Sequence, residues 1–287
     1  MENEQINIFN TNENQIIKET NEKEKKFVKQ YKKYVNFFNI GLEPSFGKEN
    51  KALDLILKEA FERAFFKINK VSIDGAKIEC LKMTKEFLFG CIHKESELDI
   101  LTELKNSADG NNINIDDLIL EYLTFFYLDY KTACISVIKT QRIQNCYIYI
   151  ENLLHKYSRY NFSIIPFKKE KEEIEQMIAT GIKLTYIDVD DFKLLKDLNS
   201  DECQLSQFQL NAKFKKTSKN FVPNLIKNLK DNKKVKKLSI STNNEDIDIL
   251  KSTFTRQVAI NLSKNFKQDL NSIMYSLRDE LLKIINT

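Results

Sequence analysis

The chain has 287 residues, of which 42% are hydrophobic and 30% are charged, and its net charge is +4. This length is enough to bury a large core and allows one large domain or two smaller ones. Six glycines, three prolines and no tryptophan argue against a loop-rich binding module and against long disordered linkers. The sequence has no run of about 18 apolar residues and no signal-peptide pattern in MENEQINIFN, so we expect neither a membrane span nor secretion.

The cysteines are scattered and odd in number, and no two of them have the CxxC spacing. Several lie within apolar runs such as FGCIH and TACISVI. This usage is typical of reduced, buried thiols and predicts a cytoplasmic protein. The five are Cys80, Cys91, Cys134, Cys146 and Cys203.

Residues 1–47 are interpreted as an N-terminal helical extension. Apolar residues recur at roughly helical spacing between Asn14 and Phe38, which predicts a helix there. The glycines and the proline of GLEPSFGKEN then indicate a loop.

Residues 48–157 form the predicted first lobe. KALDLILKEA, residues 51–60, is typical of a short amphipathic helix, and strand character follows it. Asp74-Gly75 lies between two apolar runs and predicts a β-hairpin, with KEFLFGCIHK as a third strand. Further on, NIDDLILEYL predicts a helix with an acidic first turn, LTFFYLD and KTACISVIKT predict two strands, and residues 142–157 predict another helix.

Residues 158–287 form the predicted second lobe, in which strands and helices alternate. The strand NFSIIPF precedes a helix over KKEKEEIEQMIAT, which Gly181 would end as a C-cap residue, and IKLTYIDV is the next strand. The strand FQLNAKF, the helix FVPNLIKNLKD and the strand VKKLSIS follow. The two lobes together predict an α+β fold of mostly antiparallel sheet with packed helices.

A long C-terminal helix is predicted from about Thr255 to Ile285. Its apolar residues follow a 4-4-3-4-4-3 spacing, close to that of a coiled-coil seam. Two roles are open, since the helix can pack on its own sheet or join a second copy in a dimer or bundle. The seam residues are Leu262, Phe266, Leu270, Ile273, Leu277, Leu281 and Ile284.

The strongest functional signal is the charge of residues 213–237, which we call the basic segment. It contains ten lysines and a single acid, Asp231, so the rest of the chain carries a net negative charge. Such a local excess predicts a polyanionic partner, most simply nucleic acid. The expected phosphate contacts are Lys213, Lys215, Lys216 and Lys219 at the strand–helix junction and Lys233, Lys234, Lys236 and Lys237 at the helix–strand junction.

Lysine is a point charge without the bidentate fork of arginine, and no arginine lies in the basic segment. We therefore expect contacts to phosphate rather than to bases, with binding that ignores sequence and weakens steeply with salt. Thr217 and Ser218, near the start of the short helix, would add hydroxyl and N–H donors suited to phosphate. The alternative is a solvated face that only keeps an oligomeric scaffold protein soluble.

Asp188, Asp190 and Asp191 in YIDVDDFK are the best candidate metal ligands. Asp188 and Asp190 alternate to one side of a strand, and the following Lys193 completes a superficial likeness to the end of a restriction-type nuclease motif. However, no upstream Asp completes that motif, and a strand end followed by a helix N-cap explains the same residues. A metal-dependent nuclease toxin is therefore the alternative, and the preferred interpretation has no catalytic residue, no metal and no cofactor.

Other catalytic signatures are weak. His93 and His155 are the only histidines and lack metal-ligand spacing, and Cys91 beside His93 lacks a third group to orient a nucleophile. Neither GxxxxGK[ST] nor GxGxxG occurs, so neither familiar type of nucleotide site is predicted.

Three regions of the chain resemble the RexA type of phage-exclusion protein. Residues 61–154 combine a hairpin, the acidic helix start NIDDL, the paired strands TFFYLDYKTACISVI and a helix ending in YIYIENLL. Residues 164–198 have that family's rhythm of a proline-ended strand, a helix and a strand, and residues 208–226 place a basic turn between strand and helix. The resemblance covers about two-thirds of the chain and leaves out the first 47 residues.

The resemblance implies a homodimer that binds double-stranded DNA with little sequence preference and acts as a sensor or regulator in abortive infection. In that family the effector step is attributed to a membrane partner. Double-stranded DNA is therefore the expected ligand, with RNA as an alternative.

Overall fold

The computed structural model describes residues 29–43, 51–94, 120–187, 207–229, 232–262 and 266–286, apart from residues 121, 141, 142 and 144. Within these ranges it contains five helices and twelve strands, and the strands pair antiparallel throughout. The predicted α+β class, with mostly antiparallel sheet and a long C-terminal helix, is confirmed.

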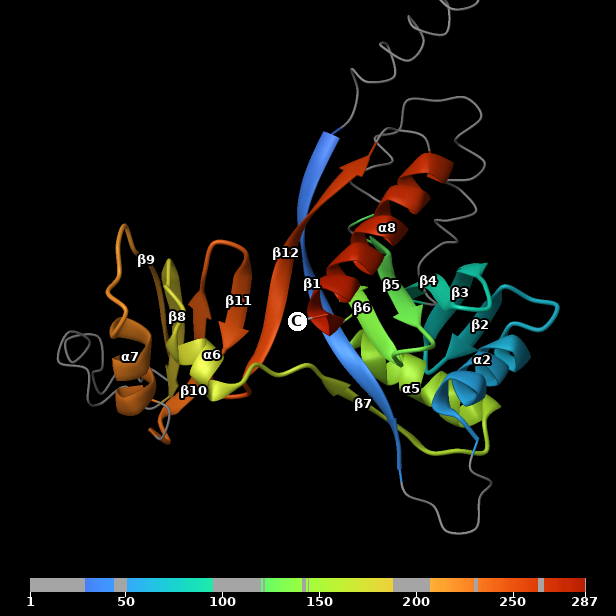
Figure 1. Cartoon of the computed structure of the whole chain (residues 1–287), viewed down its shortest axis with the longest axis horizontal. Coiled ribbons are helices and arrows are strands. Elements are labelled where there is room, and N and C mark those ends of the chain that lie inside the picture. Colours follow the sequence, from blue (N-terminus) through green and yellow to red (C-terminus); the bar gives the residue numbers. More distant parts are fainter. Residues whose placement is uncertain are drawn as a thin grey trace, which may run out of the picture.

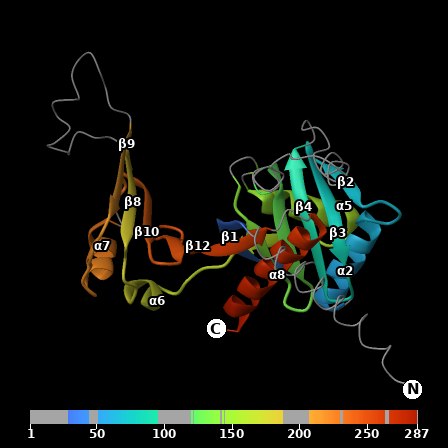
Figure 2. The same ribbon diagram turned by 90° about the horizontal axis from the view of Figure 1, so that it is seen from above.

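All twelve strands belong to one sheet, shown in Figures 1 and 2. The order is β2-β3-β4-β5-β6-β1-β12-β11-β10-β8-β9, and β7 pairs with β1 outside this path. The strands are β1 (Lys29–Leu42), β2 (Lys70–Ile73), β3 (Ala76–Met83), β4 (Phe87–Lys94), β5 (Thr124–Asp129), β6 (Cys134–Ile138), β7 (Phe162–Pro166), β8 (Gly181–Ile187), β9 (Gln207–Lys213), β10 (Val235–Ser241), β11 (Glu245–Asp248) and β12 (Thr253–Leu262).

The larger lobe, which contains β2 to β6, has helices on both faces of the sheet, whereas the described helices of the smaller lobe, which contains β8 to β11, lie on one face. Helices α2 (Leu53–Ala64) and α5 (Cys146–Tyr157) pack on one face of the larger lobe. The helix α8 (Phe266–Ile285) covers the opposite face of that lobe. The helices α6 (Lys171–Glu175) and α7 (Phe221–Leu229) lie on the same side as α8 but over the smaller lobe.

Strand β1 joins the two lobes. Its residues 29–36 pair with β12 and its residues 38–42 with β7, so these two strands follow each other along one edge. Residues 35–39 pair with β6 on the other edge. Lys168, just after β7, bridges to Thr253 at the start of β12, which closes the join between them.

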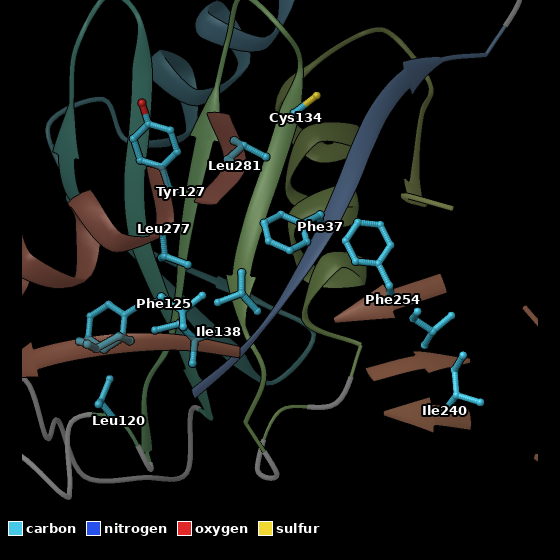
Figure 3. Close-up of a cluster of buried hydrophobic side chains, with 14 of the residues drawn as sticks. Phe37, Leu120, Phe125, Tyr127, Cys134, Ile138, Ile240, Phe254, Leu277 and Leu281 are labelled. Carbon is cyan, nitrogen blue, oxygen red and sulfur yellow. The ribbon is translucent and has the colours of Figure 1, made fainter. Parts of the chain in front are cut away.

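A continuous apolar cluster runs along the α8 face from the larger lobe into the smaller one. Figure 3 shows Leu277 and Leu281 of α8 near Phe37 and Ile138, with Ile240 of β10 at the far end. The rings of Phe37 and Phe254 stack with 5.8 Å between their centroids, which links β1 to β12. The coiled-coil-like stripe of α8 is therefore covered by the protein's own sheet.

The helix predicted over residues 14–38 is wrong from Lys29 onward, where the chain forms β1. In this strand both faces are buried, with Val35 and Phe37 in one core and Phe38 in the other. A short apolar run buried on both faces has no alternating pattern, so spacing alone does not separate it from a helix. The earlier part of the predicted helix lies outside the described residues.

Two other predicted helices are shorter than expected. The C-terminal helix begins at Phe266 rather than near Thr255, because Thr253–Leu262 alternates between buried and exposed residues as β12. The helix predicted up to residue 180 is only α6, and Gly181 opens β8 instead of capping a helix. A Cβ at Gly181 would lie 2.9 Å from the carbonyl oxygen of Ala212, so close strand packing explains the glycine.

Most of the other predicted elements are confirmed. Asp74 and Gly75 have φ angles of 49° and 78° and join β2 to β3 as a tight hairpin. The predicted strands at β4, β5, β6, β7, β8, β9 and β10 and the helices at α5 and α7 are present. The helix predicted over residues 51–60 continues to Ala64, and the acidic helix NIDDLILEYL falls almost wholly outside the described residues.

The domain boundaries after residues 47 and 157 stay predictions. The sheet is continuous across both positions, because β1 pairs with β6 and β7 pairs with β1. In addition, α8 packs on β5 and β6, which precede residue 157. Of the helices in the described ranges, none has the length and apolarity needed to cross a bilayer.

Gly90 permits the close packing of β3, β4 and β5. A Cβ there would lie 2.5 Å from the carbonyl oxygen of Glu79 and 2.7 Å from the ring of Phe126. We predict that Gly90→Ala lowers the free energy of unfolding by about 1–3 kcal/mol, measured by urea denaturation. Gly75→Asn is the control, because its surroundings are open and Asn tolerates a positive φ. Equal losses in both variants would contradict the packing argument.

The described cysteines are free thiols, and three of the four are buried. Burial raises the pKa of Cys80 to about 11 and that of Cys146 to about 12, so both remain protonated at neutral pH. We predict that a Cys203→Ser variant reacts with a thiol reagent far more slowly when folded than when unfolded, at about pH 8. Rapid reaction of Cys146 in the folded protein would show that its environment is open to water.

Candidate nucleic-acid interface

The basic segment forms the strand–helix–strand unit that its sequence predicts. It starts at the end of β9, continues through residues 214–220 and α7, and enters β10. Helix α7 packs on the α8 side of the sheet through Val222 and Ile226. Seven of the eight predicted contact lysines are exposed, and Lys234 is half-buried.

The structure separates the two predicted groups of lysines. Lys213 pairs with Gly181 at the start of β8, whereas Lys237 pairs with Thr185 four residues further along the same strand. At about 3.3 Å per residue, this places them about 13 Å apart along the strands. Lys215, Lys216 and Lys219 follow Lys213 at one end of the unit, and Lys233 and Lys236 lie with Lys237 at the other.

A polar sheet face connects these two ends. Strand alternation puts one set of side chains of β8, β9 and β10 on the side opposite α6 and α7, and we call this the outer face. Gln209 and Asn211 are exposed there, and the side chain of Lys183 is 49% exposed. The outer face consists of Lys183, Thr185, Gln207, Gln209, Asn211, Lys213, Lys237 and Ser239.

Sequence reasoning did not select Lys183 or the amide side chains of β9. These residues lie outside the lysine-rich run or carry no charge. The signal that could have found them is the alternation in QFQLNAK, where Gln207, Gln209, Asn211 and Lys213 occupy every second position. This polar row on a strand indicates a face that is not buried in the core.

Acidic side chains of β11 border the outer face on the side where the sheet continues to β12. Lys183 Nζ lies 3.4 Å from Asp246 Oδ2, on strand β11. Asp248 accepts hydrogen bonds from the backbone N–H groups of Leu250 and Lys251. The positive potential is therefore strongest toward β9 and weakens toward β11, where carboxylates offset it.

The residues 214–220, which we call the basic loop, are held against the sheet. The Thr217 hydroxyl donates to the Ala179 carbonyl oxygen at 2.8 Å, and the Phe214 N–H donates to the Thr180 carbonyl oxygen at 2.8 Å. The rings of Phe214 and Phe221 meet edge to face at 5.0 Å. Thr217 therefore has a structural partner in place of the expected phosphate, while the Ser218 side chain is exposed.

The candidate metal ligands Asp188, Asp190 and Asp191 lie outside the described residues, and so does Lys193. In the described ranges, no group of three or more His, Cys, Asp or Glu side chains is placed to hold a metal ion. His155 Nε2 lies 3.0 Å from the Phe162 carbonyl oxygen and 2.9 Å from the Phe162 amide nitrogen, and His93 is buried. His155 therefore links α5 to β7.

No protein-family model matches this chain, and no curated protein matches it significantly. The RexA-type resemblance therefore stays a prediction from the sequence.

We predict that Thr217→Val loosens the basic loop, because it removes the hydroxyl that donates to Ala179. The expected loss is about 1 kcal/mol of the free energy of unfolding, with faster hydrogen exchange at the Phe214 N–H. Thr217→Ser keeps the hydroxyl and should behave like the parent protein. Unchanged exchange in Thr217→Val would show that the ring contact of Phe214 and Phe221 alone holds the loop.

Proposed function

We propose that this protein binds double-stranded DNA without sequence specificity through the outer face and the two lysine groups at its ends. The observation that carries the proposal is that Lys213 and Lys237, one from each predicted group, lie on the same polar sheet face, while five of the other six predicted lysines are exposed close to them in the chain. Lys183 adds charge between the two ends. Phosphate contacts of this kind supply affinity but carry little sequence information.

The composition of the outer face favours a duplex over a single strand. None of the eight side chains of the outer face is aromatic, whereas single-strand sites usually stack bases on aromatic rings. Lys213 and Lys237 are offset by about 13 Å along the strands and by two strand spacings, about 10 Å, across the sheet, so they are further apart than the width of the major groove, about 12 Å.

The biological role that we propose is a sensor or regulator in phage defence, and this part rests on the RexA-type resemblance. The same resemblance supports a homodimer and a separate membrane effector as partners. Within the described residues, the apolar stripe of α8 is buried in the protein's own core. A homodimer would therefore have to use another surface.

We predict that Lys215→Glu/Lys216→Glu and Lys236→Glu/Lys237→Glu each weaken duplex binding. Each pair should lower the slope of log affinity against log salt by about two units, since roughly one unit is lost per phosphate contact. Fluorescence anisotropy with two duplexes of unrelated sequence measures both quantities. The losses should be equal for the two sequences, because phosphate contacts do not depend on the bases.

The matched control is Lys85→Glu/Lys131→Glu, which makes the same change in net charge on exposed turns of the larger lobe. It should leave the salt slope nearly unchanged. An equal loss in the control would contradict the assignment to the outer face. Tighter binding of a single strand or of RNA than of duplex DNA would overturn the choice of ligand, and magnesium-dependent degradation of the duplex would favour a nuclease.

A further inference from the structure

The larger lobe contains a charged pocket that the proposed DNA-binding surface does not use. It lies between one face of α2 and the short segment that follows α5, and its volume is about 380 Å³. This is within the range of small-molecule sites, roughly 300–1,000 Å³. Its polar lining residues are Lys51, Glu59, Arg63, Ser158, Arg159 and Tyr160, and we call it the α2 pocket.

The α2 pocket has an excess of positive charge. Three cationic side chains and one carboxylate line it, which leaves a net charge of +2. Glu59 pairs with Lys51 and lies 3.7 Å from Arg63. The hydrogen bond from Lys51, together with the charges of Lys51, Arg63 and Arg159, lowers the pKa of Glu59, so its carboxylate stays ionised and contributes one negative charge to the pocket.

The cations of this pocket differ in kind from those of the basic segment. Two of the five arginines in the chain line the α2 pocket, whereas the basic segment has only lysines. The guanidinium fork matches the oxygens of phosphate or carboxylate in a bidentate manner, which lysine cannot do. Arg63 is 63% exposed at its side chain and is therefore accessible to a ligand from solvent.

The lining also limits what the ligand can be. Ile56 and Ala60 are buried residues of α2 that form the apolar part of the pocket, between its charged residues. The Ser158 hydroxyl accepts a hydrogen bond from the Tyr160 N–H, which holds the following turn beside Arg159. Since Ile56 is 3% and Ala60 1% exposed, a ligand in the pocket would contact mainly charged and polar groups.

We propose that the α2 pocket binds the phosphate group of a small phosphorylated molecule. Arg63 and Arg159 hold the phosphate oxygens, and Lys51 adds a third positive charge. The site is separate from the outer face, since none of its residues belongs to β8, β9 or β10. Its occupancy is therefore independent of the DNA-binding proposal.

Isothermal titration calorimetry of the full chain with inorganic phosphate, pyrophosphate and a nucleoside monophosphate tests this site. We expect saturable binding of at least one of them, and Arg63→Gln should weaken it by about tenfold or more, the effect of losing one charged hydrogen-bonding partner.

Two controls separate this site from general anion binding. Arg278→Gln, on the exposed side of α8, and Lys215→Glu/Lys216→Glu should both keep the parent affinity for the phosphate ligand. Arg63 is largely exposed, so Arg63→Gln should fold normally, and a thermal melt checks this. Absence of saturable binding, full affinity in Arg63→Gln, or an equal response to sulfate at matched ionic strength would overturn the proposal.

Discussion

The structure depends on the pairing of the buried middle of β1 along both of its edges. Unpaired N–H and C=O groups in a buried strand would be strongly destabilising, so this part of β1 needs a neighbour on each side. The neighbours come from distant parts of the chain: β12 and β7 share one edge, and β6 occupies the other. Because β12 leads directly into α8, the pairing of β1 also places α8 on the face of β5 and β6.

Polar contacts reinforce this join between the lobes. Arg256 of β12 donates to Glu245 at 3.0 and 2.8 Å and lies 3.5 Å from Glu280 of α8. Lys169, which follows β7, lies 3.1 Å from Glu245. Both carboxylates are largely buried, at 11% and 14% exposed, and loss of Arg256 would weaken the compensation of their charge, which Lys169 and Lys283 would still provide in part. The network therefore ties β11, β12, α8 and the chain after β7 to one another.

The two lobes arrange their positive charge differently. In the smaller lobe, lysines lie toward both ends of a polar sheet face, an arrangement suited to the regularly spaced phosphates of an extended polymer. In the larger lobe, arginines line a pocket of limited volume, an arrangement suited to one small anion. The difference follows from local shape, since a flat strand surface spreads charge and the space between α2 and the chain after α5 concentrates it.

The sequence by itself determined most of the elements and the chemical character of the basic segment. The Asp74-Gly75 hairpin, the alternation in β9 and the amphipathic α7 are local patterns, and each of them predicts its structure correctly. Only the tertiary structure decided that residues 29–42 and 253–262 are strands, because their apolar spacing fits both helix and strand until partners on each edge are known. Likewise, the residues of the basic segment do not specify how far apart its two lysine groups lie. That distance is set by the register of β9 and β10 on β8, which is a pairing between residues far apart in the chain.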